Sequence, residues 1–427
     1  MLNKDGTPMA DNGVLKTQLD NGLTVVLKEM HHAPVASFWV WYKVGSRNEI
    51  PGITGSAHWV EHMMFKGTDR RTAEDVNREL DELGGQSNAY TTEEQTVYYS
   101  TVLPKFQDRL IDLLTDMMGP KLDESEFNTE RQVILEEIAK YEDHPPFGAF
   151  ERAMEVYFGP RGLGRRVLGT ADSIRSMTAE RMRGYFNRRY RPENIVLAAT
   201  GNVDFDGLVA AAEAKTATWS QRPTGDELPS DDLSSVPVGI QLDKTLAIVD
   251  ASQAYVVRMR PGPTQTSEDR FAARALASIL GDDGSSRLFW DLIDTGRAEV
   301  ATAWPQEFTD TGSWFNYIVC APDEVSAVTE AFDKVMHDVA QNGVNQEEFS
   351  QTINKARASS IMQSERPINR LSAVGGRWLT CNEYLSTDDG LEKLKQLTVE
   401  DVSKAAAKYL PGEFTQIQAI AQPAAAT

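Results

Sequence analysis

Apolar runs and helix-like spacing alternate along the first half of the chain. Residues 35–46, VASFWVWYKVGS, form a nearly continuous apolar run that predicts a buried strand. The segments that follow predict helices at 55–67, 73–85, 105–118 and 123–142, a strand pair at 87–103 and a buried strand at 194–204. The first half therefore combines strands with long amphipathic helices.

The second half repeats this order of elements. Its pattern predicts strands at 254–263 and 300–322 and helices at 267–281, 286–296, 323–341 and 345–363. Strand pairs followed by helix pairs favour an α+β fold, with an antiparallel sheet and helices packed on one face in each half. We therefore expect two homologous domains that arose by duplication.

The length and one polar stretch place the domain boundary. A chain of 427 residues is too long for a single hydrophobic core. The segment around residues 223–238 is rich in Pro, Ser, Asp and Gly and has no apolar periodicity. We expect an N-terminal domain at 1–222, a linker at 223–238 and a C-terminal domain at 239–427.

Charge and composition exclude several classes of function. The net charge of −20 repels phosphate backbones and argues against nucleic-acid binding, although it is compatible with cationic peptide partners. No apolar run is long enough to span a membrane. The N-terminus lacks a secretory signal, so we expect a cytoplasmic protein if Met1 is the natural start and a periplasmic one if a signal was trimmed. The two cysteines form no CxxC motif, which excludes a cysteine-based zinc site.

The helix predicted at 55–67 carries a polar group inside an apolar segment. His58 and His62 lie one turn apart, with Glu61 on the same face. Burying two imidazoles and a carboxylate costs several kcal/mol unless each has a partner. A zinc ion held by both histidines, with Glu61 facing a bound water, satisfies all three. The alternative is two core histidines bonded to backbone carbonyls, and zinc also requires a third ligand.

Helix geometry selects that third ligand within residues 123–142. The apolar residues define one buried stripe, made of Val133, Ile134, Ile138 and Tyr141. Glu130 and Glu137 fall on this stripe, whereas Glu136 is rotated about 100° toward solvent. We predict Glu137 as the zinc ligand and Glu130 as a partner of a ligand histidine. The alternative for either carboxylate is a buried arginine partner.

These residues resemble a known family. The inverted motif His58-x-x-Glu61-His62, followed by Glu137, is similar to that of the inverzincin peptidases of the M16 (pitrilysin) family. The likeness is to the short-chain M16B branch, which includes mitochondrial processing peptidase β-subunits and bacterial relatives. It extends over nearly the whole chain, through the segments 65–68, 83–99, 190–204 and 284–289.

The resemblance implies a zinc-dependent endopeptidase with one Zn²⁺ per chain. Glu61 is then the general base, and extended or unfolded peptides are cleaved within a closed chamber. The strand containing Asn88 and Ala89 matches the one with which the family pairs extended substrate.

One departure from the family pattern lies in the second half. Active members place an Arg and a Tyr, seven residues apart, near the metal to grip the substrate. The matching positions here are Ile293 and Val300, whose side chains donate no hydrogen bond. We therefore expect this chain to be the catalytic subunit of a heterodimer whose homologous partner supplies the Arg/Tyr pair. The alternatives are a catalytically silent scaffold and a peptide-binding subunit.

Overall fold

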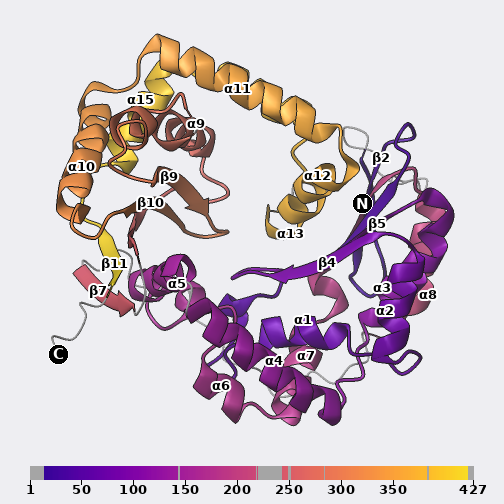
Figure 1. The fold of residues 1–427 in the computed structure, drawn as a ribbon. Helices are drawn as coiled ribbons and strands as arrows, with labels where there is room; N and C mark the ends of the chain where they lie inside the picture. The colour runs from indigo at the N-terminus through magenta and orange to yellow at the C-terminus, as the bar shows by residue number, and fades with distance from the viewer. Residues whose placement is uncertain are drawn as a thin grey trace. The chain divides into compact units, whose positions relative to one another are not determined.

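The computed structural model describes residues 14–142, 145–217, 219, 243–248, 252–282, 284–381 and 384–421. The chain divides into two compact units (Figure 1). Unit 1 contains Met1–Ile138, Arg165–Asp231 and Met362–Thr387, and unit 2 contains Ala139–Gly164, Asp232–Ile361 and Asp388–Thr427. The linker expected at 223–238 lies outside the described residues. The boundaries at 222 and 239 stay a prediction.

Unit 1 is built on a six-stranded sheet. Its strands are β1 (Val14–Gln18), β2 (Thr24–Glu29), β3 (Ala36–Tyr42), β4 (Gln86–Thr91), β5 (Thr96–Val102) and β6 (Ile195–Gly201). They lie in the order β1-β2-β6-β3-β5-β4, which makes β4 an edge strand. All neighbours are antiparallel except β2 and β6, which are parallel.

The longer helices of unit 1 form a large core on one face of this sheet. They are α1 (Ser56–Met64), α2 (Ala73–Glu82), α3 (Gln107–Met117), α4 (Glu124–Glu142), α6 (Ala171–Ser176), α7 (Ala179–Arg189) and α8 (Phe205–Thr216). Short 3₁₀ turns lie at η1 (Ser46–Asn48), η2 (Pro104–Phe106) and η4 (Pro192–Asn194). Alternate strand residues such as Phe38, Val40 and Tyr42 are fully buried beneath the helices. The core therefore surrounds α1, the helix that carries the two histidines.

A segment from the second half of the chain covers the opposite face of the same sheet. It comprises α12 (Pro367–Leu371), η8 (Ser372–Gly376) and α13 (Arg377–Cys381). Leu371 and Val374 pack against Trp39 and Trp41, the β3 residues that point away from the main core. Gly375 is required there, because a Cβ atom at that position would lie 2.3 Å from Nε1 of Trp41.

Unit 2 has a five-stranded sheet of similar design. Its strands are β7 (Asp243–Ile248), β8 (Ala254–Pro261), β9 (Val300–Glu307), β10 (Gly312–Cys320) and β11 (Thr415–Ala421), in the order β7-β11-β8-β10-β9. β7 and β11 are parallel, and the other neighbours are antiparallel.

Helices cover both faces of the unit 2 sheet. The helical segments of unit 2 are α5 (Pro145–Phe158), η3 (Gly162–Gly164), α9 (Arg270–Gly281), η7 (Phe289–Ile293), α10 (Val325–Asn342), α11 (Gln346–Ser364), α14 (Thr387–Gln396) and α15 (Val399–Tyr409). Val256 faces α9, α10 and α15, whereas its neighbour Val257 faces α5. The second face is thus covered by a helix from the first half of the chain.

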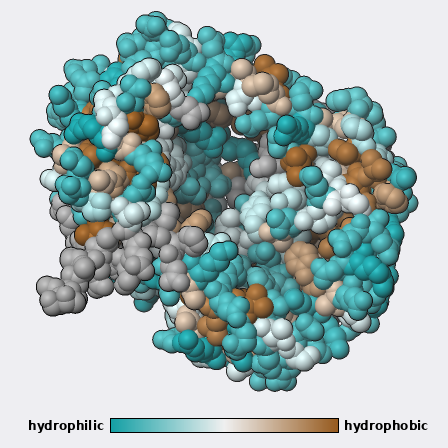
Figure 2. Space-filling model, in the orientation of Figure 1, coloured by the Kyte–Doolittle hydropathy of each residue, from teal (hydrophilic) through white to brown (hydrophobic). Residues whose placement is uncertain are grey.

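The structure confirms the expected α+β class, but the sheets depart in two details from the expected plan of antiparallel strands with helices on one face. Each sheet contains one parallel pair, and each has a second helical layer contributed by a distant part of the sequence. Among the described helices, none is both long and apolar enough to cross a membrane. On the face drawn in Figure 2, hydrophilic residues predominate and hydrophobic residues form separate patches.

Candidate metal centre

The helix α1 begins in a tightly fixed backbone conformation. Gly55 precedes it with φ +92°, and a Cβ atom there would lie 2.7 Å from the carbonyl oxygen of Leu168. The two side-chain oxygens of Glu49 accept hydrogen bonds of 2.8 Å from the backbone N–H groups of Gly55 and Ala57. Glu49 therefore caps the positive end of the helix. This cap fixes where the next residue, His58, enters the site.

An aromatic stack aligns α1 with α4. The rings of Trp59 and Phe127 lie 4.2 Å apart and nearly parallel, at 5°. Phe127, Glu130 and Ile134 are buried on the same face of α4, and Glu137 follows on that face with a partly buried side chain. The stack therefore directs both predicted carboxylates toward the histidines.

Three predicted ligands converge at one point. Nε2 of His58 and Nε2 of His62 each lie 3.7 Å from the same oxygen, Oε2 of Glu137. The two imidazole rings are 4.6 Å apart. Their ligand atoms all lie within 4.8 Å of one another, and this is the only such group of His, Cys, Asp or Glu in the described part of the chain.

This donor set fits a zinc ion. A distance of 3.7 Å is too long for a hydrogen bond, so the three atoms face one another without satisfying one another. Two ligands at about 2.1 Å from a tetrahedral metal are separated by about 3.4 Å, which is close to the 3.7 Å between Glu137 and each imidazole. Two imidazoles and one carboxylate are also a common ligand set for catalytic zinc.

Glu130 lies behind His62 rather than in the ligand group. Nδ1 of His62 donates a 2.8 Å hydrogen bond to Oε2 of Glu130, and Lys66 Nζ lies 2.6 Å from its Oε1. Burial opposes ionisation of Glu130, but His62 and Lys66 outweigh it, so the pKa of Glu130 is lowered. Burial likewise opposes protonation of His62, and the bond to Glu130 outweighs it and raises the pKa of His62. Glu130 therefore orients the His62 ring.

His58 is the more buried of the two histidines. Burial, with the charge of His62 adding to it, lowers the pKa of His58 to about 3. The ring is therefore neutral near pH 7, as a metal ligand must be. Its Nδ1 atom has no hydrogen-bond partner among the described residues.

Glu61 is bound to a strand instead of to the histidines. Its Oε2 accepts a 2.5 Å hydrogen bond from the hydroxyl of Thr91, the last residue of β4. Burial raises the pKa of Glu61, and the bond from Thr91 acts in the opposite direction. Glu61 directly precedes His62 on α1. The charge of His62 lowers the pKa of Glu61, and the charge of Glu137 raises it.

The residues predicted to bind substrate lie on the edge strand β4. Asn88 is exposed, and its Oδ1 accepts a 2.8 Å hydrogen bond from the N–H of Ala89. Ala89 is partly buried and packs against the main core of unit 1. The outer edge of β4 pairs with no other strand in the described residues.

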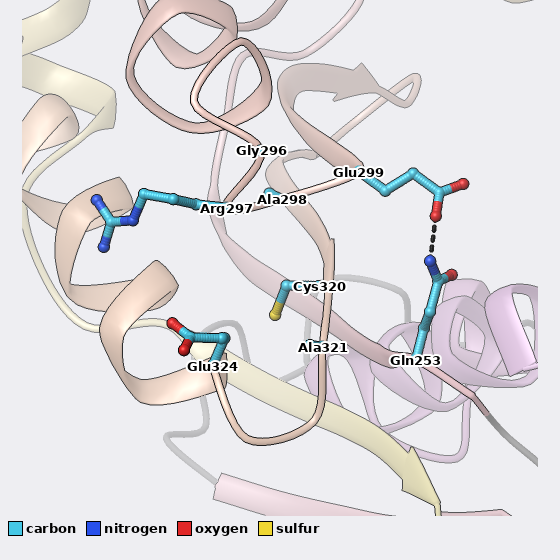
Figure 3. Close-up of a pocket in the computed structure, with 8 residues that line it drawn as sticks. All are labelled: Gln253, Gly296, Arg297, Ala298, Glu299, Cys320, Ala321 and Glu324. Atoms are coloured by element: carbon cyan, nitrogen blue, oxygen red, sulfur yellow. Dashed lines mark hydrogen bonds between the residues drawn. The ribbon is translucent and has the colours of Figure 1, made fainter.

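The two positions of the expected clamp lie in unit 2. Ile293 ends η7 and packs against the core, whereas Val300 begins β9 and pairs with Val319. Between them, residues 296–299 line part of a pocket of about 540 Å³, and its other lining residues are Gln253, Cys320, Ala321 and Glu324 (Figure 3). Arg297 and Glu299 extend away from each other there, and Arg297 donates to the carbonyl of Ala327. Neither Ile293 nor Val300 offers a polar side chain.

Three polar contacts of the site were not predicted from the sequence. They are the cap by Glu49, the pairing of Lys66 with Glu130 and the bond from Thr91 to Glu61. Lys66 lies one turn after His62, and that spacing is a signal that could have identified it. Glu49 and Thr91 reach the site from a loop and a distant strand, for which helical spacing gives no indication. One sequence expectation is wrong: Val133, assigned to the buried stripe of α4, is 42% exposed.

The chain has two compact units, and comparison with known families finds a match in each half of the chain. Residues 24–171 match the profile of insulinase (peptidase family M16), and residues 176–356 match the peptidase M16 inactive domain. The chain belongs to peptidase family M16.

Individual relatives support this assignment. The chain is 32% identical over 402 residues to an uncharacterized zinc protease of Streptomyces coelicolor, covering 93% of this chain and 87% of the relative. It is 33% identical over 409 residues to one of Mycobacterium tuberculosis strain H37Rv, covering 95% and 93%. A crystal structure of a protease from Helicobacter pylori has the same fold, with a TM-score of 0.87, 23% identity and coverage of 95% and 99%.

Proposed function

We propose that this chain is a zinc-dependent endopeptidase. The observation that carries the proposal is the convergence of His58, His62 and Glu137, with both imidazole Nε2 atoms facing one carboxylate oxygen. The relatives are named as zinc proteases, and these names support the choice of metal. The site belongs to the N-terminal domain that we assign to residues 1–222.

Each residue has a distinct role in this proposal. His58, His62 and Glu137 hold one zinc ion per chain, and Glu130 orients His62. The ion supplies polarisation of the scissile carbonyl and a lower pKa for the attacking water. Glu61, which lies beside the ligand group, accepts a proton from that water and donates it to the leaving amine.

The substrate is an extended or unfolded peptide. β4 is an edge strand, so its outer backbone groups can pair with an added strand. Thr91 at the end of β4 contacts Glu61, so a peptide paired along Asn88 and Ala89 runs toward the base. Backbone pairing of this kind selects flexible peptides over folded proteins.

We further propose that the chain acts as the catalytic subunit of a heterodimer, in which a closed chamber admits peptides. The support is chemical, because Ile293 and Val300 offer no hydrogen-bond donors in their side chains. A homologous partner with an Arg/Tyr pair at these positions would complete the grip on the substrate.

Peptide hydrolysis by the zinc-loaded chain, with and without a co-purified homologous partner, tests the proposal. We expect cleavage that requires zinc and increases when the partner is present. Glu61→Gln should retain zinc and lose turnover, because the amide cannot accept the proton. Cleavage by Glu61→Gln would contradict the role of Glu61, and full activity of the isolated chain would contradict the need for a partner.

A further inference from the structure

The bond between Thr91 and Glu61 joins two elements that the sequence keeps apart. Glu61 lies in α1 and Thr91 ends β4, yet the hydroxyl lies 2.5 Å from Oε2 of the carboxylate. A hydrogen bond to an ionised group at such a distance is among the stronger ones in proteins. The Thr91 hydroxyl bonds Oε2 of Glu61, the proposed base, and does not bond Oε1.

The hydroxyl proton of Thr91 has one good acceptor. Its other polar neighbour is the hydroxyl of Thr96, which is 3.5 Å away and directly opposite in the strand pair. Thr96 donates its own proton to the carbonyl of Val44, at 2.8 Å. The shorter distance to Glu61 directs the Thr91 proton to the carboxylate.

Thr91 is held rigidly by the turn that follows it. The N–H of Thr92 donates to the carbonyl of Gln95 at 2.8 Å, which closes the β4–β5 hairpin. The N–H groups of Ser46 and Arg47 donate to the carbonyls of Thr92 and Glu93, at 3.2 Å and 2.9 Å.

The loop before α1 fits closely against the same turn. A Cβ atom on Gly45 would lie 2.4 Å from the carbonyl oxygen of Glu93, so this approach requires glycine. Arg47 also pairs with Glu94. The hairpin end is thereby attached to the loop that precedes α1, and Thr91 has little freedom to move relative to Glu61.

We infer that Thr91 is a positioning residue for the reaction: its hydroxyl fixes the carboxylate of Glu61 through Oε2, leaving Oε1 to receive the proton. The inference rests on the proposed function of Glu61. Thr91 also belongs to the strand proposed to pair with substrate, so one strand aligns both the peptide and the base. A carboxylate held in one rotamer presents its oxygen to the water without reorganisation.

A matched pair of variants tests this inference in the full-length, zinc-loaded chain, assayed alone and together with the co-purified partner. Thr91→Val replaces the hydroxyl by a methyl group, and Thr91→Ser keeps the hydroxyl. We expect Thr91→Val to lower kcat about 10- to 100-fold, with KM, zinc stoichiometry and zinc affinity unchanged. Thr91→Ser should restore most of kcat. Thr101→Val serves as a control, because that hydroxyl bonds Ser37 on β3 instead.

Several results would overturn the inference. Unchanged kcat in Thr91→Val removes the role, and an equal loss in Thr91→Ser shows that the methyl group matters instead of the hydroxyl. If Thr91→Val loses zinc or thermal stability while Thr91→Ser does not, the role of the hydroxyl is purely structural. A zinc-loaded wild type that stays inactive both alone and with a co-purified homologous partner would contradict the proposed function itself. Crystal structures of the zinc-loaded wild type and Thr91→Val then decide independently, because a Glu61 carboxylate that stays in place without the hydroxyl refutes the positioning role.

Discussion

His62 donates its Nδ1 proton to Glu130 across 2.8 Å. This bond fixes the tautomer of the ring and leaves Nε2 with the lone pair that a metal needs. Glu130 as a whole residue is 3% exposed, so water competes little with the interaction. The ligand group thus depends on a residue outside it.

The carboxylate of Glu130 should strengthen zinc binding. Glu130→Ala should weaken zinc binding about 10- to 100-fold, because the His62 ring loses its fixed orientation. Glu130→Gln should have a smaller effect, since its amide oxygen can still accept from Nδ1. Competition with a chromogenic chelator measures the affinity. Glu124→Gln, an exposed glutamate at the start of the same helix, should leave it unchanged.

Adjacent glutamates on α4 should behave differently. Glu137→Ala should reduce bound zinc from one ion per chain to nearly none, because it removes one of three ligands. Its exposed neighbour Glu136 is the matched control, and Glu136→Ala should retain full zinc. Metal analysis after dialysis against metal-free buffer compares the two. Equal zinc content in both variants would show that the helix face has been misassigned.

Removal of metal should lower thermal stability. A ligand that binds only the folded state at 100 times its Kd adds about 2.7 kcal/mol, which corresponds to about 5–10 °C in Tm for a unit of this size. Calorimetry with zinc and with chelator measures this shift. Glu61→Gln should show the same shift as the wild type, whereas His58→Ala should show none. A shift that persists in His58→Ala would place the stabilising ion elsewhere.

Glu49 should make stability depend on pH. Burial raises its pKa from 4.5 to about 8, although the hydrogen bonds from the N–H groups of Ala57 and Gly55, and then the charge of Arg165, act in the opposite direction. Between these values the folded state retains a proton that the unfolded state has released, so the free energy of unfolding falls as pH rises from about 4.5 to about 8.

Urea denaturation across this range tests the effect of Glu49. Glu49→Gln should remove its share of the slope, which is at most about 1.4 kcal/mol per pH unit. The exposed Glu180→Gln on α7 should keep the wild-type slope. An unchanged slope in Glu49→Gln would show that Glu49 stays ionised throughout.

Two glycines of the C-terminal region should respond in opposite ways to alanine. Gly375→Ala places a methyl group 2.3 Å from Nε1 of Trp41 and should destabilise unit 1 by about 1–3 kcal/mol. Gly390 lies in α14 with no atom near its missing Cβ, so Gly390→Ala should stabilise by about 0.5–1 kcal/mol. Denaturation curves of both variants provide the measurement. A neutral Gly375→Ala would mean that η8 is displaced from the sheet at little cost.

Regular spacing within single helices explains what the sequence predicted well. His58 and His62 share a face because they are one turn apart, and the same geometry separates Glu137 from the exposed Glu136. Val133 shows where apolar periodicity no longer predicts burial. It lies at the margin of the apolar stripe, where periodicity cannot decide whether a neighbouring element covers it, and it is exposed.

Contacts between distant segments explain what the sequence could not predict. The parallel pairing of β2 with β6 joins strands that lie far apart in the chain, and no local pattern specifies it. The bond from Thr91 to Glu61 similarly requires the β4–β5 hairpin to be placed beside α1. The pattern of apolar residues predicts elements and their buried faces, whereas their partners depend on the complete fold.

The second face of the unit 1 sheet is covered by α12, η8 and α13, which come from the second half of the chain. This arrangement has a consequence for synthesis on the ribosome. Trp39 and Trp41 are translated long before the residues that shield them, Leu371 and Val374. Until then the nascent first half exposes an aromatic surface of the kind that chaperones bind. A premature stop codon anywhere before α12 should therefore yield an aggregation-prone fragment instead of an independent zinc domain.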